Sequence, residues 1–376
     1  MLLPTLSRYL HPIYLVLLAF LFSISSANSA STNTPTTNTE LSNLCQKPAP
    51  IHFAGYVEIG GIPQWLQIRS NNCQFPIILF LHGGPANPIS PYADAIFNGW
   101  EQQFTLVQWD QRASGKTWLK TPAVGGSTLS LAQMAEDGLA LTGLLKANFP
   151  NAPVILSGSS WGSALGVAMV QRDPQLFAAY VGSAQLVSGT ENSKATYQQL
   201  LTLVTAANDK ENLAILRKLG APPYPKPNGI VRRITRQYEA KVAEPAPAQW
   251  WQPANPAEME ANAAAYEAAE EYSFLQYTGF DVNTGKTGHG MMHDIEFMQN
   301  ATEFKLPVYF IQGAGDLVTV PALTQAYVDK IKAPSKQLVM VKAAGHNPNA
   351  PMIEAQWQIM LQIRTNLMIN AASPRK

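Results

Sequence analysis

The strongest constraint on the fold of this 376-residue chain is the pentapeptide GSSWG at positions 158–162. It follows the apolar run at 153–156, which predicts a buried strand, and it opens a stretch of small residues typical of a closely packed helix. A sharp strand-to-helix turn needs glycine on both sides of its central serine, because a Cβ there would collide with neighbouring backbone. The turn lifts the Ser160 hydroxyl clear of the sheet, at a helix N-terminus that favours developing negative charge. We therefore expect Ser160 to be a nucleophile.

Alternating apolar runs and helical patterns predict an α/β domain. A hairpin is expected first, around Gly60-Gly61. Helical patterns follow at 130–145 and 352–368. The continuous apolar runs suit a mostly parallel sheet that helices cover on both faces. These runs lie at 76–81, 104–109, 153–156, 177–187, 307–311 and 337–341.

The alternation breaks between about 190 and 302, where prolines, a Trp250-Trp251 pair and an Ala/Glu-rich section occur. We predict that 190–302 is a mainly helical cap inserted into a core made of 51–189 and 303–376. Ligands of open α/β sheets bind beyond the carboxyl ends of the strands. A cap inserted there would shape the substrate pocket.

The N-terminus predicts export. Residues 1–29 combine a positive start at Arg8, an apolar stretch at 13–24 and small residues after it, as secretory signal peptides do. An uncleaved signal anchor is the alternative, although the apolar stretch is shorter than the roughly 20 residues of a membrane span. A polar linker is expected at 30–50. We expect a secreted or periplasmic protein without stable membrane insertion after signal cleavage.

The chain has two cysteines, Cys45 and Cys73. Export and the even count favour a disulfide between them. Such a bond would tie the N-terminal arm to the core across the predicted hairpin. Two unpaired thiols are the alternative.

Composition excludes several classes of function. A hydrophobic content of 46% with 14% charged residues describes a globular chain. The net charge of +1 and the lack of a basic patch argue against a nucleic-acid partner. His289 and His293 have the four-residue spacing of metal ligands, but the glutamate of H-E-x-x-H is missing and Gly290 weakens a helix there. We expect neither a metal nor an organic cofactor.

A serine hydroxyl needs a base to take its proton, and the base needs an acid to orient it. In the α/β-hydrolase chain order, serine is followed by the acid and then by histidine. Asp316 lies in a glycine-rich loop after the predicted strand 307–311, and His346 follows the next strand. We therefore predict a Ser160, Asp316, His346 triad. The alternatives are an aspartate that caps the next helix and a solvated loop histidine.

The tetrahedral intermediate needs an oxyanion hole. One donor is expected to be the backbone N–H after the nucleophile, that of Trp161. The string HGGP at 82–85 follows an earlier predicted strand, and Gly84 is the expected second donor. A plain turn is the alternative for this loop.

The strings HGGP at 82–85, WDQR at 109–112 and GSSWGS at 158–163 resemble the signatures of proline iminopeptidases and their α/β-hydrolase relatives. The resemblance covers about 53–188 and 303–368. It implies the same triad, an oxyanion hole from Gly84 and Trp161, and a helical cap whose acidic residues hold the free amino terminus of a substrate.

The chain departs from the family pattern in places. Ala86, Ala113 and Ser159 stand where the family usually has glycine. No acidic, aromatic cap string for an amino group is evident, and solvated helix faces are the alternative for the acidic candidates in the cap. Asp110 and Arg112 are expected to form a structural ion pair. The acidic candidates, by location only, are Glu267, Glu270, Glu271 and Glu296.

These observations predict an exported serine hydrolase that cleaves the N-terminal residue, of proline type, from short peptides through an acyl-enzyme. A carboxylesterase that acts on small esters with the same triad is the first alternative. A non-catalytic ligand-binding protein on a hydrolase scaffold is the second. The expected partner is a small peptide or ester, and the oligomeric state stays open.

Overall fold

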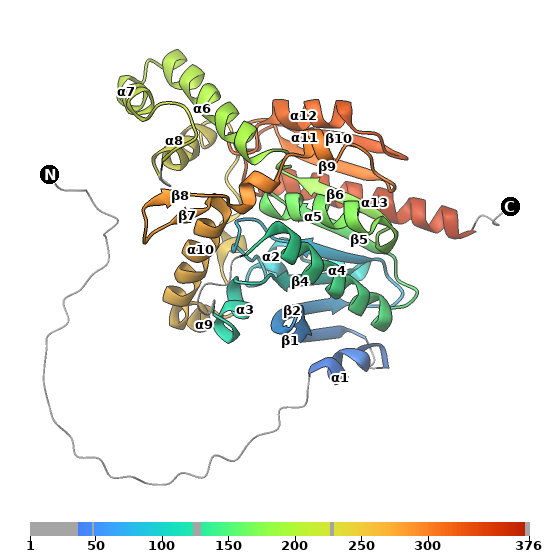
Figure 1. The fold of residues 1–376 in the computed structure, drawn as a ribbon. Helices are drawn as coiled ribbons and strands as arrows, with labels where there is room; N and C mark the ends of the chain where they lie inside the picture. Colours follow the sequence, from blue (N-terminus) through green and yellow to red (C-terminus); the bar gives the residue numbers. More distant parts are fainter. Residues whose placement is uncertain (1–36, 47–48, 123–128, 226–228, 373–376) are drawn as a thin grey trace, which may run out of the picture. The chain divides into compact units, whose positions relative to one another are not determined.

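The computed structural model of the chain describes residues 37–46, 49–122, 129–225 and 229–372. The predicted signal peptide at 1–29 lies outside the described residues. Within the described residues, an eight-stranded sheet has the order β1-β2-β4-β3-β5-β6-β9-β10 (Figure 1). The strands are β1 Ile51–Ile59, β2 Ile62–Ser70, β3 Ile77–Leu81, β4 Thr105–Asp110, β5 Val154–Ser159, β6 Ala179–Ser183, β9 Val308–Gly313 and β10 Lys336–Val341.

The sheet is mostly parallel. β1 and β2 form the predicted antiparallel hairpin, and β2 pairs antiparallel with β4. All pairings from β4 to β10 are parallel, so their carboxyl ends meet at one edge. The predicted strand at 177–187 is shorter than expected, because the chain leaves the sheet at Ala184 with φ 47°.

Helices cover both faces of this sheet (Figure 1). Successive residues of β3 point to opposite sides, as strand geometry requires. Leu79 packs in one core cluster with α4 and α5, and Phe80 packs in the other with α13. The fold class predicted from the sequence is confirmed. The helices of these layers are α2 Ala93–Ile96, α3 Gly115–Lys120, α4 Leu131–Asn148, α5 Trp161–Arg172, α12 Pro321–Lys330 and α13 Ala350–Ala372.

Between β6 and β9 the chain forms a mainly helical insertion. It has a small apolar cluster of its own, in which Leu200, Leu216 and Ile234 are fully buried, and Leu317 of the core domain joins this cluster. A short hairpin of β7 Phe280–Asp281 and β8 Lys286–Thr287 was not expected. The helices of the insertion are α6 Gly189–Ala206, α7 Lys210–Leu219, α8 Ile230–Glu239, α9 Pro256–Ala261, α10 Ala263–Thr278 and α11 Phe297–Asn300.

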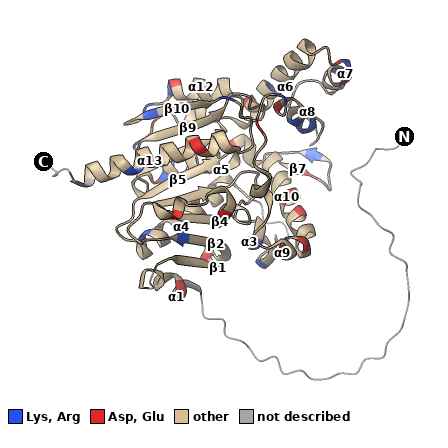
Figure 2. Cartoon of the chain, turned by 180° about the vertical axis from the view of Figure 1, so that it is seen from behind, with Lys and Arg blue, Asp and Glu red and all other residues tan. Residues whose placement is uncertain are grey.

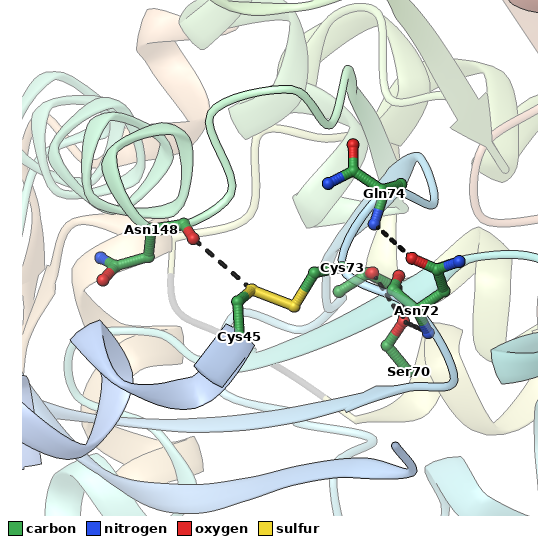
Figure 3. Close-up of a disulfide and its surroundings, with 7 residues drawn as sticks. Cys45, Ser70, Asn72, Cys73, Gln74 and Asn148 are labelled. Atoms are coloured by element: carbon green, nitrogen blue, oxygen red, sulfur yellow. Dashed lines mark hydrogen bonds between the residues drawn. A yellow bond between two sulfur atoms is a disulfide. The ribbon is translucent and has the colours of Figure 1, made fainter. Parts of the chain in front are cut away.

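A disulfide between Cys45 and Cys73 confirms the predicted pairing. It joins the short 3-10 helix η1, Leu44–Gln46, to the turn between β2 and β3 (Figure 3). The segment predicted to be a polar linker differs from that expectation, because α1, Thr37–Ser42, and η1 lie against the hairpin. Leu41 and Leu44 are fully buried there and hold the segment to the core. Among the described residues, no helix has the length and apolarity that crossing a membrane requires.

Candidate active site

Ser160 occupies the turn between β5 and α5 with φ 53° and ψ −120°. A positive φ is strained for a serine and is held only where the surroundings fix it. The flanking glycines show how tight the turn is. A Cβ on Gly158 would lie 2.2 Å from the Gly162 carbonyl oxygen, and one on Gly162 would lie 2.0 Å from the Leu81 carbonyl oxygen. Only glycine fits at either position, as the sequence pattern indicated.

The structure brings together the three side chains that the sequence singled out. Ser160 follows β5, Asp316 follows β9 and His346 follows β10, so all three lie at the carboxyl edge of the sheet. The Ser160 Oγ lies 3.0 Å from the Nε2 of His346. On the other side of the ring, Nδ1 lies 3.1 Å from both carboxylate oxygens of Asp316. The spacing is that of a nucleophile, a base and an orienting acid.

Asp316 is completely buried and lies among hydrogen-bond donors. Its Oδ1 accepts from the backbone N–H groups of Val318 and Thr319, both at 2.8 Å. Its Oδ2 accepts from the Thr319 hydroxyl at 2.6 Å and from the Gln312 amide at 2.9 Å. Burial by itself would raise the pKa of Asp316, but the neighbouring imidazole and these donors outweigh it and lower the pKa. Asp316 is therefore ionised at neutral pH.

The pKa of His346 is raised above its ordinary value. Burial lowers it, but the charge and hydrogen bond of the Asp316 carboxylate outweigh burial, and the Glu239 carboxylate adds to the rise. Arg232 opposes the rise by repelling the imidazolium. The imidazole of His346 therefore keeps its proton to a higher pH than an ordinary histidine does.

Glu239 is a buried carboxyl at the end of α8 that the sequence did not mark. Its Oε1 accepts from the Leu317 backbone N–H at 2.7 Å. Its pKa is raised, chiefly by burial and against the effect of the hydrogen bonds from the Leu317 and His346 backbone. Glu239 thus joins the insertion to the loops that carry Asp316 and His346. No pattern in the sequence pairs position 239 with these loops, because the contact spans 78 residues.

The HGGP loop lies directly beside Ser160. A Cβ on Gly83 would lie 3.3 Å from the Ser159 carbonyl oxygen and 3.4 Å from the Cβ of Ser160. Gly84 has φ 118° and is exposed, so its backbone is open to a ligand. Trp161 is the first residue of α5, where N–H groups have no acceptor within the helix. Trp161 directly follows Ser160, and Gly84 follows Gly83, the residue of the HGGP loop that lies beside Ser160.

Hydrogen bonds join the three sequence signatures. The imidazole Nδ1 of His82 donates to the Gly83 carbonyl oxygen at 2.9 Å, and its Nε2 accepts from the Gln111 backbone at 3.2 Å. Burial lowers the pKa of His82 to about 4, which keeps the ring neutral. The Gln111 side chain donates to the His82 carbonyl oxygen and accepts from the indole N–H of Trp161 at 3.1 Å. His82 and Gln111 thus hold the HGGP loop against the turn that carries Ser160.

The predicted ion pair between Asp110 and Arg112 is wrong. Arg112 binds Asp137 of α4 at 2.7 and 3.0 Å. Asp110 instead accepts from the Ser90 hydroxyl at 2.6 Å and from the Lys116 backbone at 2.8 Å, and burial raises its pKa to about 6. The two side chains therefore have separate partners, although they are only two residues apart in the chain.

The four acidic candidates in the insertion lie in different surroundings. Glu267 and Glu271 are exposed on α10. Glu296 accepts from the hydroxyls of Ser188 and Thr190 at 3.0 and 2.6 Å, which is a structural arrangement. Glu270 lines a cavity, as described below. The structure therefore does not gather these carboxylates at one point.

Comparison with known proteins places the chain in a family. Residues 72–349 match the family model described as serine aminopeptidase, S33, and the chain belongs to this family of α/β-hydrolases. It is 26% identical over 298 residues to the probable aminopeptidase YbaC of Bacillus subtilis (strain 168). The aligned region covers 78% of this chain and 90% of that protein. A shorter match of 126 residues, 31% identical, is to the proline iminopeptidase of Neisseria gonorrhoeae, covering 34% of this chain and 37% of that protein.

Solved structures share the fold. The proline iminopeptidase of Mycobacterium smegmatis is similar with a TM-score of 0.56 and 17% identity, over 84% of this chain and all of that one (100%). VinJ is similar with a TM-score of 0.57 and 17% identity, over 85% of this chain and 100% of that one. At these identities the likeness establishes the α/β-hydrolase fold. The family match and the shared fold together identify the chain as a member of a hydrolase family.

Proposed function

We propose that the protein is a serine hydrolase that releases the N-terminal residue, of proline type, from short peptides through an acyl-enzyme on Ser160. The single observation that carries the chemistry is the continuous chain from Ser160 Oγ through the His346 ring to Asp316, with separations of 3.0 and 3.1 Å. The membership in the serine aminopeptidase family and the aminopeptidase named among the relatives support the substrate class.

In the proposed mechanism, His346 Nε2 takes the hydroxyl proton as Ser160 Oγ bonds to the scissile carbonyl carbon. The backbone N–H groups of Gly84 and Trp161 stabilise the oxyanion. His346 then gives its proton to the leaving nitrogen as the C–N bond breaks. Water repeats the sequence on the ester carbonyl and frees Ser160. Asp316 keeps Nδ1 protonated, so that Nε2 can accept, and stabilises the imidazolium.

The test is a substrate panel on the purified protein, with prolyl 4-nitroanilide, other aminoacyl 4-nitroanilides and 4-nitrophenyl acetate. We expect turnover of the prolyl arylamide, lost by roughly 10⁴-fold or more in Ser160→Ala. Labelling of Ser160 by a fluorophosphonate probe gives an independent readout. Ester turnover without any arylamide turnover would replace the peptidase proposal by the carboxylesterase, and absence of labelling in folded protein would favour the non-catalytic binder.

Export is part of the proposal. The disulfide supports it, because such bonds persist mainly in oxidising compartments. The test is expression of the full chain with N-terminal sequencing of the protein recovered outside the cytoplasm. We expect a mature N-terminus close to residue 30. Full-length protein retained with reduced cysteines would contradict this part.

A further inference from the structure

A cavity of about 610 Å³, open to solvent, lies between α8 and the turn that follows the HGGP loop. Its volume is in the range of small-molecule sites, roughly 300–1,000 Å³. Three arginines that follow one another along α8 supply much of its lining. The full lining is Asn87, Gly229, Arg232, Arg233, Arg236, Gln237 and Glu270.

The cavity carries more positive than negative charge. The three arginines face a single carboxylate, Glu270, whose Oε1 lies 3.6 Å from an Arg232 nitrogen. Within the described ranges, Arg233 and Arg236 have no carboxylate within 4.0 Å, so their guanidinium groups remain available. In Figure 2, where Lys and Arg are blue, α8 carries a group of blue residues. Guanidinium groups bind carboxylates through paired, charge-assisted hydrogen bonds.

Two contacts place this cavity beside the reacting groups. Asn87 belongs to the same turn as the HGGP loop, and its backbone N–H donates to the Gly83 carbonyl oxygen at 3.1 Å. The helix that carries the three arginines, α8, ends in Glu239, whose carboxylate accepts a hydrogen bond from the loop of Asp316. Arg232 acts electrostatically on His346. In the proposed mechanism, His346 hands its proton to the leaving nitrogen, so the leaving part of the substrate lies on the His346 side.

We propose that this cavity binds a carboxylate of the leaving part of the substrate, through Arg233 and Arg236. The ligand is the C-terminal carboxylate of a di- or tripeptide. Glu270 holds Arg232 and leaves the other two guanidinium groups for the ligand. This inference rests on the proposed peptidase function and adds to it a preference for short peptides with a free C-terminus.

The experiment compares kcat/KM for prolyl-alanine with that for prolyl-alanine amide. The acid is expected to be the better substrate. In the double variant Arg233→Gln/Arg236→Gln, the acid-to-amide ratio should fall by about tenfold to a hundredfold, as expected for losing charge-assisted hydrogen bonds. Arg217→Gln on α7, an exposed arginine outside the cavity, is the matched control and should keep the ratio. An unchanged ratio in the double variant overturns the inference.

A second substrate pair locates the carboxylate. Prolyl-aspartate amide carries its charge on the side chain and has no free C-terminus. If it equals prolyl-alanine in kcat/KM and loses as much in the double variant, the assignment to the C-terminus is overturned. If it behaves like prolyl-alanine amide, the assignment stands.

A third readout separates this inference from the proposed function. N-acetylalanine and its amide are tested as inhibitors of 4-nitrophenyl acetate turnover, which needs no peptidase activity. We expect the acid to inhibit more strongly than the amide, with an inhibition constant at least tenfold weaker in the double variant. If peptides are not cleaved but this pattern appears, the peptidase proposal fails and the anion site stands. If peptides are cleaved and the acid inhibits no better than the amide, the anion site fails. Fluorophosphonate labelling of each variant verifies that it is folded.

Discussion

Replacing Asp316 by asparagine is the sharpest test of the site, because each carboxylate oxygen has its own pair of donors. Oδ1 accepts from two backbone N–H groups, and Oδ2 accepts from a hydroxyl and an amide. Asparagine has one oxygen and one NH₂ group. If the NH₂ group faces the two backbone N–H groups, two hydrogen bonds are lost. If it faces the other pair, the Thr319 hydroxyl can turn and accept, and only the hydrogen bond from the Gln312 amide is lost.

The size of the effect follows from this count. A hydrogen bond to a charged group contributes about 1.5–3 kcal/mol, so the loss of one or two should lower the free energy of unfolding by about 1.5–6 kcal/mol. The loss of charge and of the correct imidazole tautomer should also lower kcat by about 10⁴-fold. Asp316→Asn is therefore expected to damage both stability and turnover.

The measurements are urea denaturation followed by tryptophan fluorescence, and kcat normalised to the fraction of folded protein. The donor argument is tested further by Thr319→Val, which removes one of the facing donors. In the parent this second change removes a hydrogen bond to a charged oxygen, whereas in the Asp316→Asn background it removes one to a neutral amide. It should therefore cost less in that background, by about 1 kcal/mol. Additive effects of the two changes, or a stability loss below about 1 kcal/mol, would refute the reasoning.

The pH dependence of stability tests the lowered pKa of the same carboxylate. Because the pKa of Asp316 is lowered in the folded state, its contribution is present above the unfolded value of about 3.9 and is lost as pH falls through the folded value. The parent should lose this part of its stability in acid. Asp316→Asn should lack this loss, and an identical acid dependence in both proteins would contradict the lowered pKa.

Three further predictions concern the base, the disulfide and the nucleophile turn. The raised pKa of His346 places the acid limb of kcat/KM above pH 6.5, where activity rises as the imidazole loses its proton. Glu239→Gln removes a carboxylate that raises this pKa and should move the limb to lower pH. A pH–rate profile of both proteins decides it. Cys45→Ser/Cys73→Ser removes a disulfide that spans 28 residues, and the chain-entropy account predicts that the free energy of unfolding falls by about 3.6 kcal/mol. Reduced parent protein is the control, and a loss below about 1 kcal/mol would contradict the prediction. Gly162→Ala puts a Cβ 2.0 Å from the Leu81 carbonyl oxygen and should cost at least about 2 kcal/mol and reduce fluorophosphonate labelling, whereas Gly143→Ala, with open space around its Cβ, should be tolerated.

The elements that local patterns specify were predictable. The glycine-flanked serine, the apolar runs and the order of Ser160, Asp316 and His346 predicted an α/β-hydrolase core, because strand and turn signals act over a few residues. Since parallel strands end at one edge, strand-end positions also predicted which side chains would meet. The predicted export and the even count of cysteines favoured a bond between Cys45 and Cys73, which the structure contains.

Interactions between distant segments were not predictable. Arg112 was expected to pair with a neighbour in sequence, but its partner Asp137 lies on another element, 25 residues away. The links from His82 to Gln111 and from Gln111 to Trp161 likewise join motifs that the sequence shows as separate. Side-chain direction at a strand end decides these partners, and a one-dimensional pattern does not carry that direction.

The sequence by itself determined the class of fold and the three side chains of the predicted triad, because glycine spacing and apolar periodicity are local. Only the tertiary structure decided what surrounds them. The insertion carries no strong periodic signal, yet its α8 brings Glu239 to the loops of the predicted triad and lines a cavity with arginines. Those positions depend on how a helix packs on the core, and packing is settled by contacts between residues far apart in the chain.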